Sequence, residues 1–421
     1  MSTSSNSIPV FNGEPDLSFA DQGKFTLPVI PNTVFTSILG LGKDEKHLYL
    51  AGYIFYQPLK NDYVCCRLSL DGKLDTSFGD QGYARGNFPE EDGETNGVAE
   101  HVIVQDIDGE KKILLIGEHN NRYQRPALIR LNSDGSPDKS YGKDGTVIIK
   151  LPSPPLPAPD APGSTANIPQ AIALEDGKVI VLKMAIEGTY VIRVDKDGSL
   201  DKTFNGSGYR LFNAPNGGNT FLRTVLNTTD GKYLLGGSQF EPGKPASGLI
   251  IRLLTDGTED PDYGVNGVVE IVDDSAQERG FGFNTLAPQN NNRTAAIGQA
   301  SRSVRSGLIT SREPDGSPNI QFNKATPLVT QLEFYPTAWS AGRMLPNGKL
   351  QVAGQADEPL GSNKNLVVVQ LQPNGEFDNT FGINGVVRFA GDAGAMMMLN
   401  ENRVFFSTHE SQQVIQCGLV P

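Results

Sequence analysis

The sequence predicts an all-β protein, a seven-bladed β-propeller made of four-stranded antiparallel blades. A motif of the form DG-x-x-D-x-x-F-G-x-x-G occurs seven times, in copies that begin at Asn12, Asp71, Asp134, Asp197, Asp256, Asp315 and Asn374. The copies are 59 or 63 residues apart, a period typical of arrays of one supersecondary unit. The 421 residues include 47 glycines and 28 prolines, which suits many short strands joined by tight turns.

The chain divides into a short tail and one repeat array. Residues 1–11 are polar and Ser-rich, and we expect a flexible tail there. Residues 12–421 are expected to form a single propeller. The first motif copy is followed by KFTLPVI at 24–30, which reads as a strand.

The first complete unit shows the order that the others repeat. Apolar, β-branched runs at 33–42, 47–54 and 63–70 predict three strands, and 83–88 predicts a fourth after the motif. Four antiparallel strands per repeat are typical of a propeller blade. After the seventh copy the chain has only three further strands for the last blade. We expect the N-terminal strand at 24–30 to complete that blade, closing the ring and covering both sheet edges.

The motif has a mechanical explanation. Its Asp-Gly or Asn-Gly pair suits a tight turn between the third and fourth strands. Its second acidic residue is expected to hold the turn by accepting backbone N–H bonds, and its aromatic residue to fill the gap between blades. These acidic residues are Asp16, Asp75, Asp138, Asp201, Asp260 and Asp378, and the aromatic residues are Phe19, Phe78, Tyr141, Phe204, Tyr263, Phe322 and Phe381. The sixth copy has Asn319, Asn323 and Thr326 at conserved motif positions, which predicts a looser turn.

The repeated DG-x-x-D-x-x-F-G pattern resembles the repeat of the delta-60 family of bacterial proteins. The resemblance covers residues 12–421. It implies a β-propeller-like fold and no single activity, so it assigns no catalytic residue.

Composition excludes several classes of function. Lys and Arg total 36 against 48 Asp and Glu, a net charge of −12, which argues against a nucleic-acid partner. The longest apolar run is shorter than the ~18 residues of a membrane span. The N-terminus has no signal-peptide pattern, so we expect a protein that is cytoplasmic or exported by another route. We also expect it to be a monomer. Cys65, Cys66 and Cys417 are expected to be buried, reduced thiols.

Alternating strand directions place the motif turns on one face and the variable connections on the other. The longer connections, 88–97, 151–169, 212–220 and 272–280, lie on this second face, where repeat proteins concentrate function. Each loop could instead be a solvated connector. The proline-rich stretch 151–162 is either a docking strand for an aromatic groove or a stiff excursion over the channel mouth.

Candidate ligand-binding residues gather in these connections. The acidic candidates are Glu90, Glu91, Asp92, Glu94, Asp160, Asp273, Asp274 and Asp392, and the histidines are His119 and His409. The two histidines belong to non-adjacent units, which disfavours joint metal binding. No cofactor is predicted. Calcium is the alternative, because DKDGSLD at 195–201 resembles a calcium loop, but the twelfth position of that loop is Gly206 where a Glu is needed.

The predicted function is a non-enzymatic binding or scaffold propeller that recognises a protein or glycan through the variable-loop face. The chain has no G-x-S-x-G, H-E-x-x-H or phosphate-loop motif. The alternative is a metal-dependent, lactonase-like hydrolase with a divalent ion in the central channel, to which Asp106, Glu175 and Asn284 could contribute. A single tryptophan, Trp339, disfavours a sugar-binding site.

Overall fold

The computed structural model describes residues 12–421 except for twelve residues or short segments within them. These exceptions are 58–59, 89–95, 120–124, 153–170, 186, 214–217, 276–277, 302–303, 333–335, 358–363, 392 and 410–412, together with residues 1–11 at the start. The flexible tail predicted for residues 1–11 therefore lies outside the described residues.

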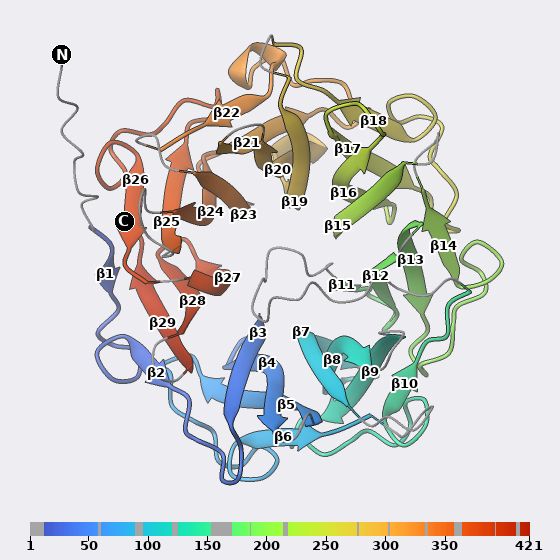
Figure 1. Ribbon diagram of the computed structural model, residues 1–421, viewed down its shortest axis with the longest axis vertical. Helices are drawn as coiled ribbons and strands as arrows, with labels where there is room; N and C mark the ends of the chain where they lie inside the picture. Colours follow the sequence, from blue (N-terminus) through green and yellow to red (C-terminus); the bar gives the residue numbers. More distant parts are fainter. Residues whose placement is uncertain are drawn as a thin grey trace.

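Seven antiparallel sheets form a ring in which the first strand of each sheet lies nearest the centre (Figure 1). Blade 1 comprises β3 (Phe35–Lys43), β4 (His47–Tyr56), β5 (Lys60–Ser69) and β6 (Tyr83–Gly86). Blade 2 comprises β7 (Gly97–Ile107), β8 (Glu110–His119), β9 (Arg125–Asn132) and β10 (Thr146–Ile148). Blade 3 comprises β11 (Ala171–Ala173), β12 (Val179–Ala185), β13 (Gly188–Val194) and β14 (Tyr209–Phe212).

The other blades follow the same order. Blade 4 comprises β15 (Asn219–Asn227), β16 (Tyr233–Phe240), β17 (Ser247–Leu253) and β18 (Val268–Ile271). Blade 5 comprises β19 (Gly280–Pro288), β20 (Thr294–Ser301), β21 (Arg305–Arg312) and β22 (Leu328–Thr330), with short 3-10 turns η3 (Asn290–Asn292) and η4 (Asn323–Ala325). Blade 6 comprises β23 (Thr337–Met344), β24 (Leu350–Asp357), β25 (Lys364–Leu371) and β26 (Val386–Phe389).

Blade 7 is built from both ends of the chain, as predicted. Its inner strands are β27 (Ala393–Asn400), β28 (Arg403–His409) and β29 (Gln413–Leu419), and its outer positions are taken by β1 (Glu14–Pro15) and β2 (Lys24–Thr26). Both N-terminal strands pair antiparallel with β29. The centroid of the Phe19 ring lies 4.9 Å from that of the Phe405 ring in β28. The first motif copy therefore also packs against the core of blade 7. The seven-bladed fold and its closure are confirmed.

The core lies between neighbouring blades, where the motif aromatics pack. All seven are at most 2% exposed. Phe78 shares one cluster with Ala51 of its own blade and Leu115 of blade 2. A Cβ on Gly135, in the next motif copy, would lie 3.2 Å from the Phe78 ring. Phe78 therefore packs in the gap between two blades.

The turn of the sixth motif copy keeps its packing, in contrast to the looser turn that the sequence predicted. Its chain passes through η4 with φ angles of 45°, 55° and 67° at Asn323, Lys324 and Ala325, so residues with side chains adopt the left-handed region. Asn319 is still buried and accepts the N–H of Gln321 at 3.0 Å. Phe322 is only 2% exposed. The turn therefore keeps its buried contacts although Asn323 and Thr326 replace two of the three motif glycines.

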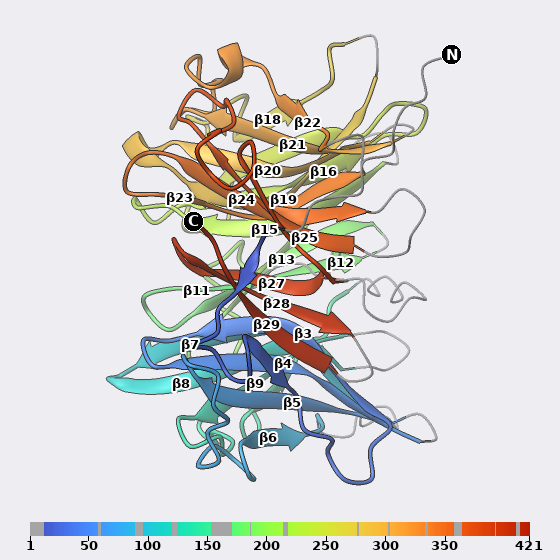
Figure 2. The ribbon, with the colours of Figure 1, turned by 90° about the vertical axis from the view of Figure 1, so that its left-hand side faces the viewer.

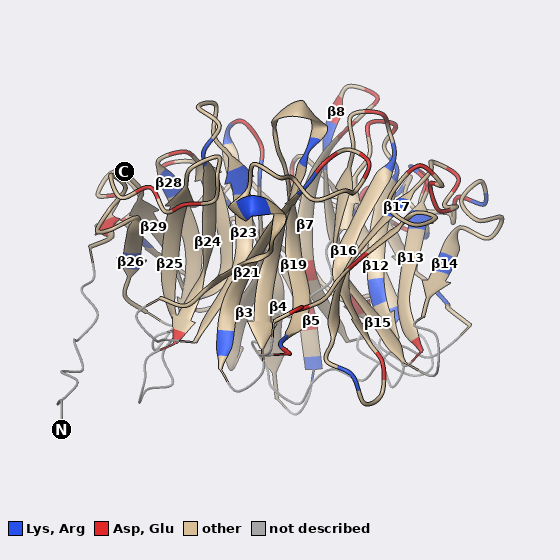
Figure 3. Cartoon of the chain, turned by 90° about the horizontal axis from the view of Figure 1, so that it is seen from above, with Lys and Arg blue, Asp and Glu red and all other residues tan. Residues whose placement is uncertain are grey.

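The two faces of the ring differ as expected. The turns between first and second strands and the motif turns share one face, here called the motif face, and the other connections form the variable-loop face (Figure 2). Lys, Arg, Asp and Glu residues are frequent in the turns of the motif face (Figure 3). Among the described residues, no helix has the length and apolar character needed to cross a membrane. Cys65, Cys66 and Cys417 are free thiols and buried.

Candidate functional site

Most of the predicted acidic ligand residues lie outside the described residues. These are Glu90, Glu91, Asp92, Glu94, Asp160 and Asp392. Asp273 is described and largely buried, and it accepts the N–H groups of Ser275 at 3.1 Å and Arg279 at 2.9 Å. Burial opposes its ionisation, but these hydrogen bonds outweigh that effect and lower the pKa of Asp273. Asp273 thus holds the connection between β18 and β19, whereas Asp274 is exposed.

One of the two predicted histidines, His119, does not lie on the surface. His119 ends β8 and is fully buried, with its ring 6.4 Å from that of Phe88. This is a correction, because a side chain on a ligand-binding face has to be accessible. The backbone of His409 ends β28 opposite Gln413, and its side chain lies outside the described residues. Within the described part of the chain, no three His, Cys, Asp or Glu side chains are grouped so as to hold a metal ion.

The acidic residues of the calcium-like stretch 195–201 are engaged by protein donors. Asp197 accepts the N–H of Ser199 at 2.8 Å. Asp201 is largely buried and is bound by Arg193 at 2.7 Å and Lys178 at 2.8 Å. These contacts support a turn-stabilising role for the stretch.

The central channel has a feature that the sequence did not reveal, a β-bulge in most of the innermost strands. Where the pairing register shifts, one residue of the first strand has no opposite partner on the second strand. These residues are Leu39, Glu100, Arg223, Asn284 and Ser340, from blades 1, 2, 4, 5 and 6. In blade 7 the shift between Ala393 and Met396 has the same effect. Chemically different residues therefore occupy the same position around the channel.

A glycine on the second strand makes the bulges of blades 1, 2, 4, 5 and 6 possible. A Cβ at Gly298 would lie 2.0 Å from the carbonyl oxygen of Gly282, and one at Gly117 would lie 1.9 Å from that of Val98. The equivalent positions in blades 1, 4 and 6 are Gly52, Gly237 and Gly354, with contacts of 1.8 to 2.0 Å. The bulged backbone thus comes closer to the second strand than any side chain allows.

Blade 3 departs from this arrangement. Its innermost strand β11 has three residues, and Lys183 of β12 stands where the second strands of blades 1, 2, 4, 5 and 6 have glycine. Lys183 forms an ion pair with Glu118 of blade 2. Burial lowers the pKa of Lys183 to about 8, although Glu100 acts in the opposite direction. Burial likewise raises the pKa of Glu100, and Lys183 opposes that rise. Three ionisable side chains therefore meet between blades 2 and 3.

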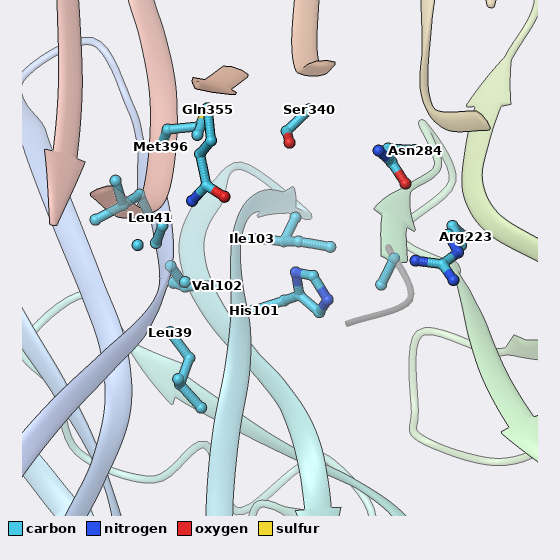
Figure 4. Close-up of a pocket in the computed structure, with 14 residues that line it drawn as sticks. Leu39, Leu41, His101, Val102, Ile103, Arg223, Asn284, Ser340, Gln355 and Met396 are labelled. Atoms are coloured by element: carbon cyan, nitrogen blue, oxygen red, sulfur yellow. The ribbon is translucent and has the colours of Figure 1, made fainter. Parts of the chain in front are cut away.

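A cavity of about 400 Å³ lies in the channel at the level of the bulges. Its polar lining is His101, Arg223, Asn284, Ser340 and Gln355, and its apolar lining includes Leu41, Ile103 and Met396. Figure 4 shows that His101, Arg223 and Asn284 project into the same space from different blades. The side-chain N–H of Asn284 donates to the carbonyl of Trp339 at 2.8 Å, which fixes this amide. The lining residues include hydrogen-bond donors on several sides.

The variable-loop face carries a second candidate site, a cluster of aromatic residues on blade 1. Phe35 begins β3 and is stacked on Phe55 near the end of β4, with ring centroids 5.3 Å apart and planes 24° apart. Tyr53 meets Phe35 edge-on at 5.9 Å. Phe35 is 39% exposed and its neighbour Val34 is 52% exposed. We call Phe35, Tyr53 and Phe55 the aromatic cluster.

The residues predicted for a channel metal do not come together. Asn284 lines the cavity, but Glu175 is exposed in the turn between β11 and β12. Asp106 is 57% exposed near the motif-face end of β7, beside Lys111. Trp339 is fully buried, and its ring N–H donates to Thr330 at 2.9 Å. It is therefore a core residue and not available for stacking on a sugar.

Comparison with models of protein families gives a match to parts of two repeats. A family model described as a β-propeller domain of unknown function, DUF5122, matches residues 111–141 and 345–381. Both matched segments contain the second and third strands of a blade and end on a motif aromatic, Tyr141 or Phe381. A comparison with curated proteins finds no match.

Several solved structures are similar in overall arrangement. YCF48 from Cyanidioschyzon merolae is 12% identical with a TM-score of 0.45, covering 94% of this chain and 98% of that one. The polysaccharide lyase Uly1 is 9% identical with a TM-score of 0.49, covering 94% and 91%. The β-propeller domain of the Trilobed protease from Pyrococcus furiosus is 10% identical with a TM-score of 0.46, covering 92% and 94%. In its repeating unit, this chain is similar to a β-propeller repeat family, the one described by the two matched segments.

Proposed function

We propose that this protein is a non-enzymatic binding propeller that recognises a protein or glycan ligand through its variable-loop face. The aromatic cluster carries this proposal. Stacked, partly exposed aromatic rings offer a flat apolar surface at low cost in side-chain entropy, and such rings are common where proteins bind ligands. Phe35 and Phe55 lie where β3 begins and β4 ends, on the face that also bears the variable connections.

The motif face is less suited to recognising one partner. Its turns are nearly identical from blade to blade, and they bond to each other. For example, the N–H of Gly142 donates to the carbonyl of Asp197 in the next copy at 2.8 Å. A surface of repeated turns with internally satisfied groups offers little that is specific to one ligand. The proposed ligand therefore contacts the aromatic cluster and the connections at 88–97, 151–168, 212–220 and 272–280.

We also propose, from the sequence, that the repeat is of the delta-60 type and that the protein acts as a monomer. The alternative of a hydrolase with a divalent ion in the channel gains no observation from the described residues. Of its three predicted contributors only Asn284 lines the cavity.

The experiment is a pull-down from the native host and a glycan array, followed by binding measurements with Phe35→Ala. We expect at least about tenfold weaker binding, since removing one well-packed aromatic contact costs more than about 1.4 kcal/mol. The matched control is Val265→Ala, an exposed apolar residue of the motif face at 77% exposure. Weaker binding by the Val265 variant together with unchanged binding by the Phe35 variant would place the ligand on the other face.

A further inference from the structure

We propose that the central cavity is a separate binding site for a small organic acid, a molecule with one carboxylate and an apolar body. This site is distinct from the aromatic cluster of the variable-loop face. Its volume of about 400 Å³ falls within the range of roughly 300–1,000 Å³ that is usual for small-molecule pockets.

Arg223 gives the cavity its anion-binding character. The bulge between Leu222 and Thr224 places Arg223 outside the regular pairing of β15, and its side chain projects into the cavity (Figure 4). A guanidinium group is planar, remains charged at neutral pH and matches the two oxygens of a carboxylate. His101 and Asn284 project into the same space, so further polar groups are available to the same anion.

The charge balance of the cavity is opposite to that of the whole chain. The protein has a net charge of −12, yet none of the described residues lining the cavity is Asp or Glu. Two carboxylates of blade 2 interact with Lys183. Glu118 is paired with it directly, and Glu100 interacts with it through charge. Among the described residues that line the cavity, only Arg223 carries a permanent charge.

The opposite part of the lining favours an apolar body. Leu41 of blade 1, Ile103 of blade 2 and Met396 of blade 7 contribute apolar side chains. In Figure 4, Leu41 and Met396 lie on the side of the cavity away from Arg223. A ligand that spans the cavity would place its carboxylate near Arg223 and its carbon chain near these residues. Inorganic phosphate would leave the apolar part unfilled.

The first test measures hexanoate, its amide hexanamide and inorganic phosphate by calorimetry and ligand-observed NMR. We expect hexanoate to bind, hexanamide to bind at least about tenfold more weakly, and phosphate to bind more weakly than hexanoate. A hydrogen bond to a charged group contributes about 1.5–3 kcal/mol, which corresponds to tenfold or more. Equal binding of hexanoate and hexanamide, or preferred binding of phosphate, would overturn the inference.

The second test changes the lining. Arg223→Ala should abolish hexanoate binding. Gln355→Glu keeps the side-chain shape and adds a negative charge, so it should weaken hexanoate at least about tenfold and leave hexanamide unchanged. Because Gln355→Glu leaves Arg223 in place, this variant still tests the site if Arg223→Ala disturbs the bulge. Phe35→Ala should bind hexanoate as the unchanged protein does, which separates this site from the proposed function. Unchanged hexanoate affinity in both cavity variants refutes the site.

Discussion

Each motif carboxylate is held by donors from two strands, and this pattern extends beyond the motif itself. Asp138 accepts the N–H and hydroxyl of Ser140, while Arg130 of β9 and Lys112 of β8 supply charge at 2.8 and 3.5 Å. Arg67, Arg193 and Arg252 take the place of Arg130 in other blades, and Lys178, Lys232 and Lys349 take the place of Lys112. The arginine also stacks on the motif aromatic, at 4.5 Å from the Tyr141 ring centroid.

Two departures from this pattern involve both partners. In the sixth copy Asn319 replaces the carboxylate and Ser311 replaces the arginine, and the two side chains are hydrogen-bonded at 3.0 Å. In the closing blade Cys417 occupies the arginine position, and Arg403 of the neighbouring strand binds Asp16 at 2.7 Å. A buried charge is retained only where a counter-charge is present, as its desolvation cost requires.

The first prediction concerns Asp138→Asn at neutral pH. The asparagine can keep the turn, but it leaves Arg130 and Lys112 without a buried counter-charge. We expect the free energy of unfolding to fall by ~3 kcal/mol at pH 6, measured by urea titration. The control is Asp134→Asn, because Asp134 is exposed and bonded to Ser136, so its loss should cost much less. Equal losses in the two variants would contradict this account.

The same variant should change the dependence of stability on pH. Burial opposes ionisation of Asp138, but hydrogen bonds from Ser140 and the charge of Arg130 lower its pKa from 3.8 to about 2. A carboxylate with a lowered pKa stabilises the fold above its unfolded pKa, and this contribution is lost as pH falls through the folded pKa. The unchanged protein should therefore lose stability between about pH 4 and pH 2. The Asp138→Asn variant should show a shallower loss over that window.

At the level of the strand, the bulges determine which residues of the first strands line the channel. In blade 5 the extra residue is Asn284, and the glycine beside the bulge is Gly298, which is paired with Phe283. This glycine has ordinary strand geometry, so its role is steric and not conformational. Replacing it would force the first strand away from the second and would move Asn284 out of the cavity wall.

The second prediction compares two glycines of blade 5. Gly298→Ala would place its Cβ 2.0 Å from the carbonyl oxygen of Gly282, and we expect a loss of at least about 3 kcal/mol in thermal or urea unfolding. Gly282→Ala is the matched control, because its Cβ would meet only the Ser238 side chain at 3.5 Å, an ordinary contact. We expect a change within about 0.5 kcal/mol there. A tolerated Gly298→Ala would show that the bulge yields easily.

The strands and the motif turns could be predicted from the sequence, whereas the channel lining could not. The period-2 alternation that marks strands such as 47–54 does not show which residue of the first strand is extra. A signal was nonetheless present, because Gly52, Gly117, Gly237, Gly298 and Gly354 recur at one position inside apolar strands. A recurring glycine in a strand interior indicates a bulge or close backbone approach.

The aromatic cluster escaped prediction for a different reason. Phe35, Tyr53 and Phe55 read as ordinary strand residues, and only the pairing of β3 with β4 brings Phe35 opposite Phe55 at the exposed end of the sheet. His119 was predicted to lie on the exposed face, but strand pairing buries it. It lies beside a connection in the sequence, but the pairing of β8 with Gly97 turns it into the core.

At the scale of the whole molecule, the ring is held closed by residues from both chain ends. Phe19, Phe25, Leu27 and Ile30 share a core cluster with Phe405 and Ile415. Cys417 corresponds to Gln370 of blade 6, because their carbonyl oxygens accept the N–H groups of Asp16 at 2.9 Å and Asp378 at 2.8 Å. Three residues separate Gln370 from the motif copy at Asn374, and residues 418–420 are the equivalent three after Cys417, with Pro421 at the position of Asn374.

The last prediction uses this correspondence. Deleting residues 1–31 removes β1, β2 and four buried apolar side chains, each contributing about 1.5–3 kcal/mol. That sum rivals the ~5–15 kcal/mol stability of a whole domain, so we expect aggregation or a large fall in melting temperature. Deleting only residues 1–8 should change little. Attaching residues 12–31 directly after Val420 of the shortened chain should restore most of the stability, because the repeat spacing is then that of blade 6. The comparison is made by size exclusion and thermal unfolding of the four chains. If the chain lacking residues 1–31 melts like the full-length protein, or the transplanted segment restores nothing, the closure of blade 7 is not what holds the ring together.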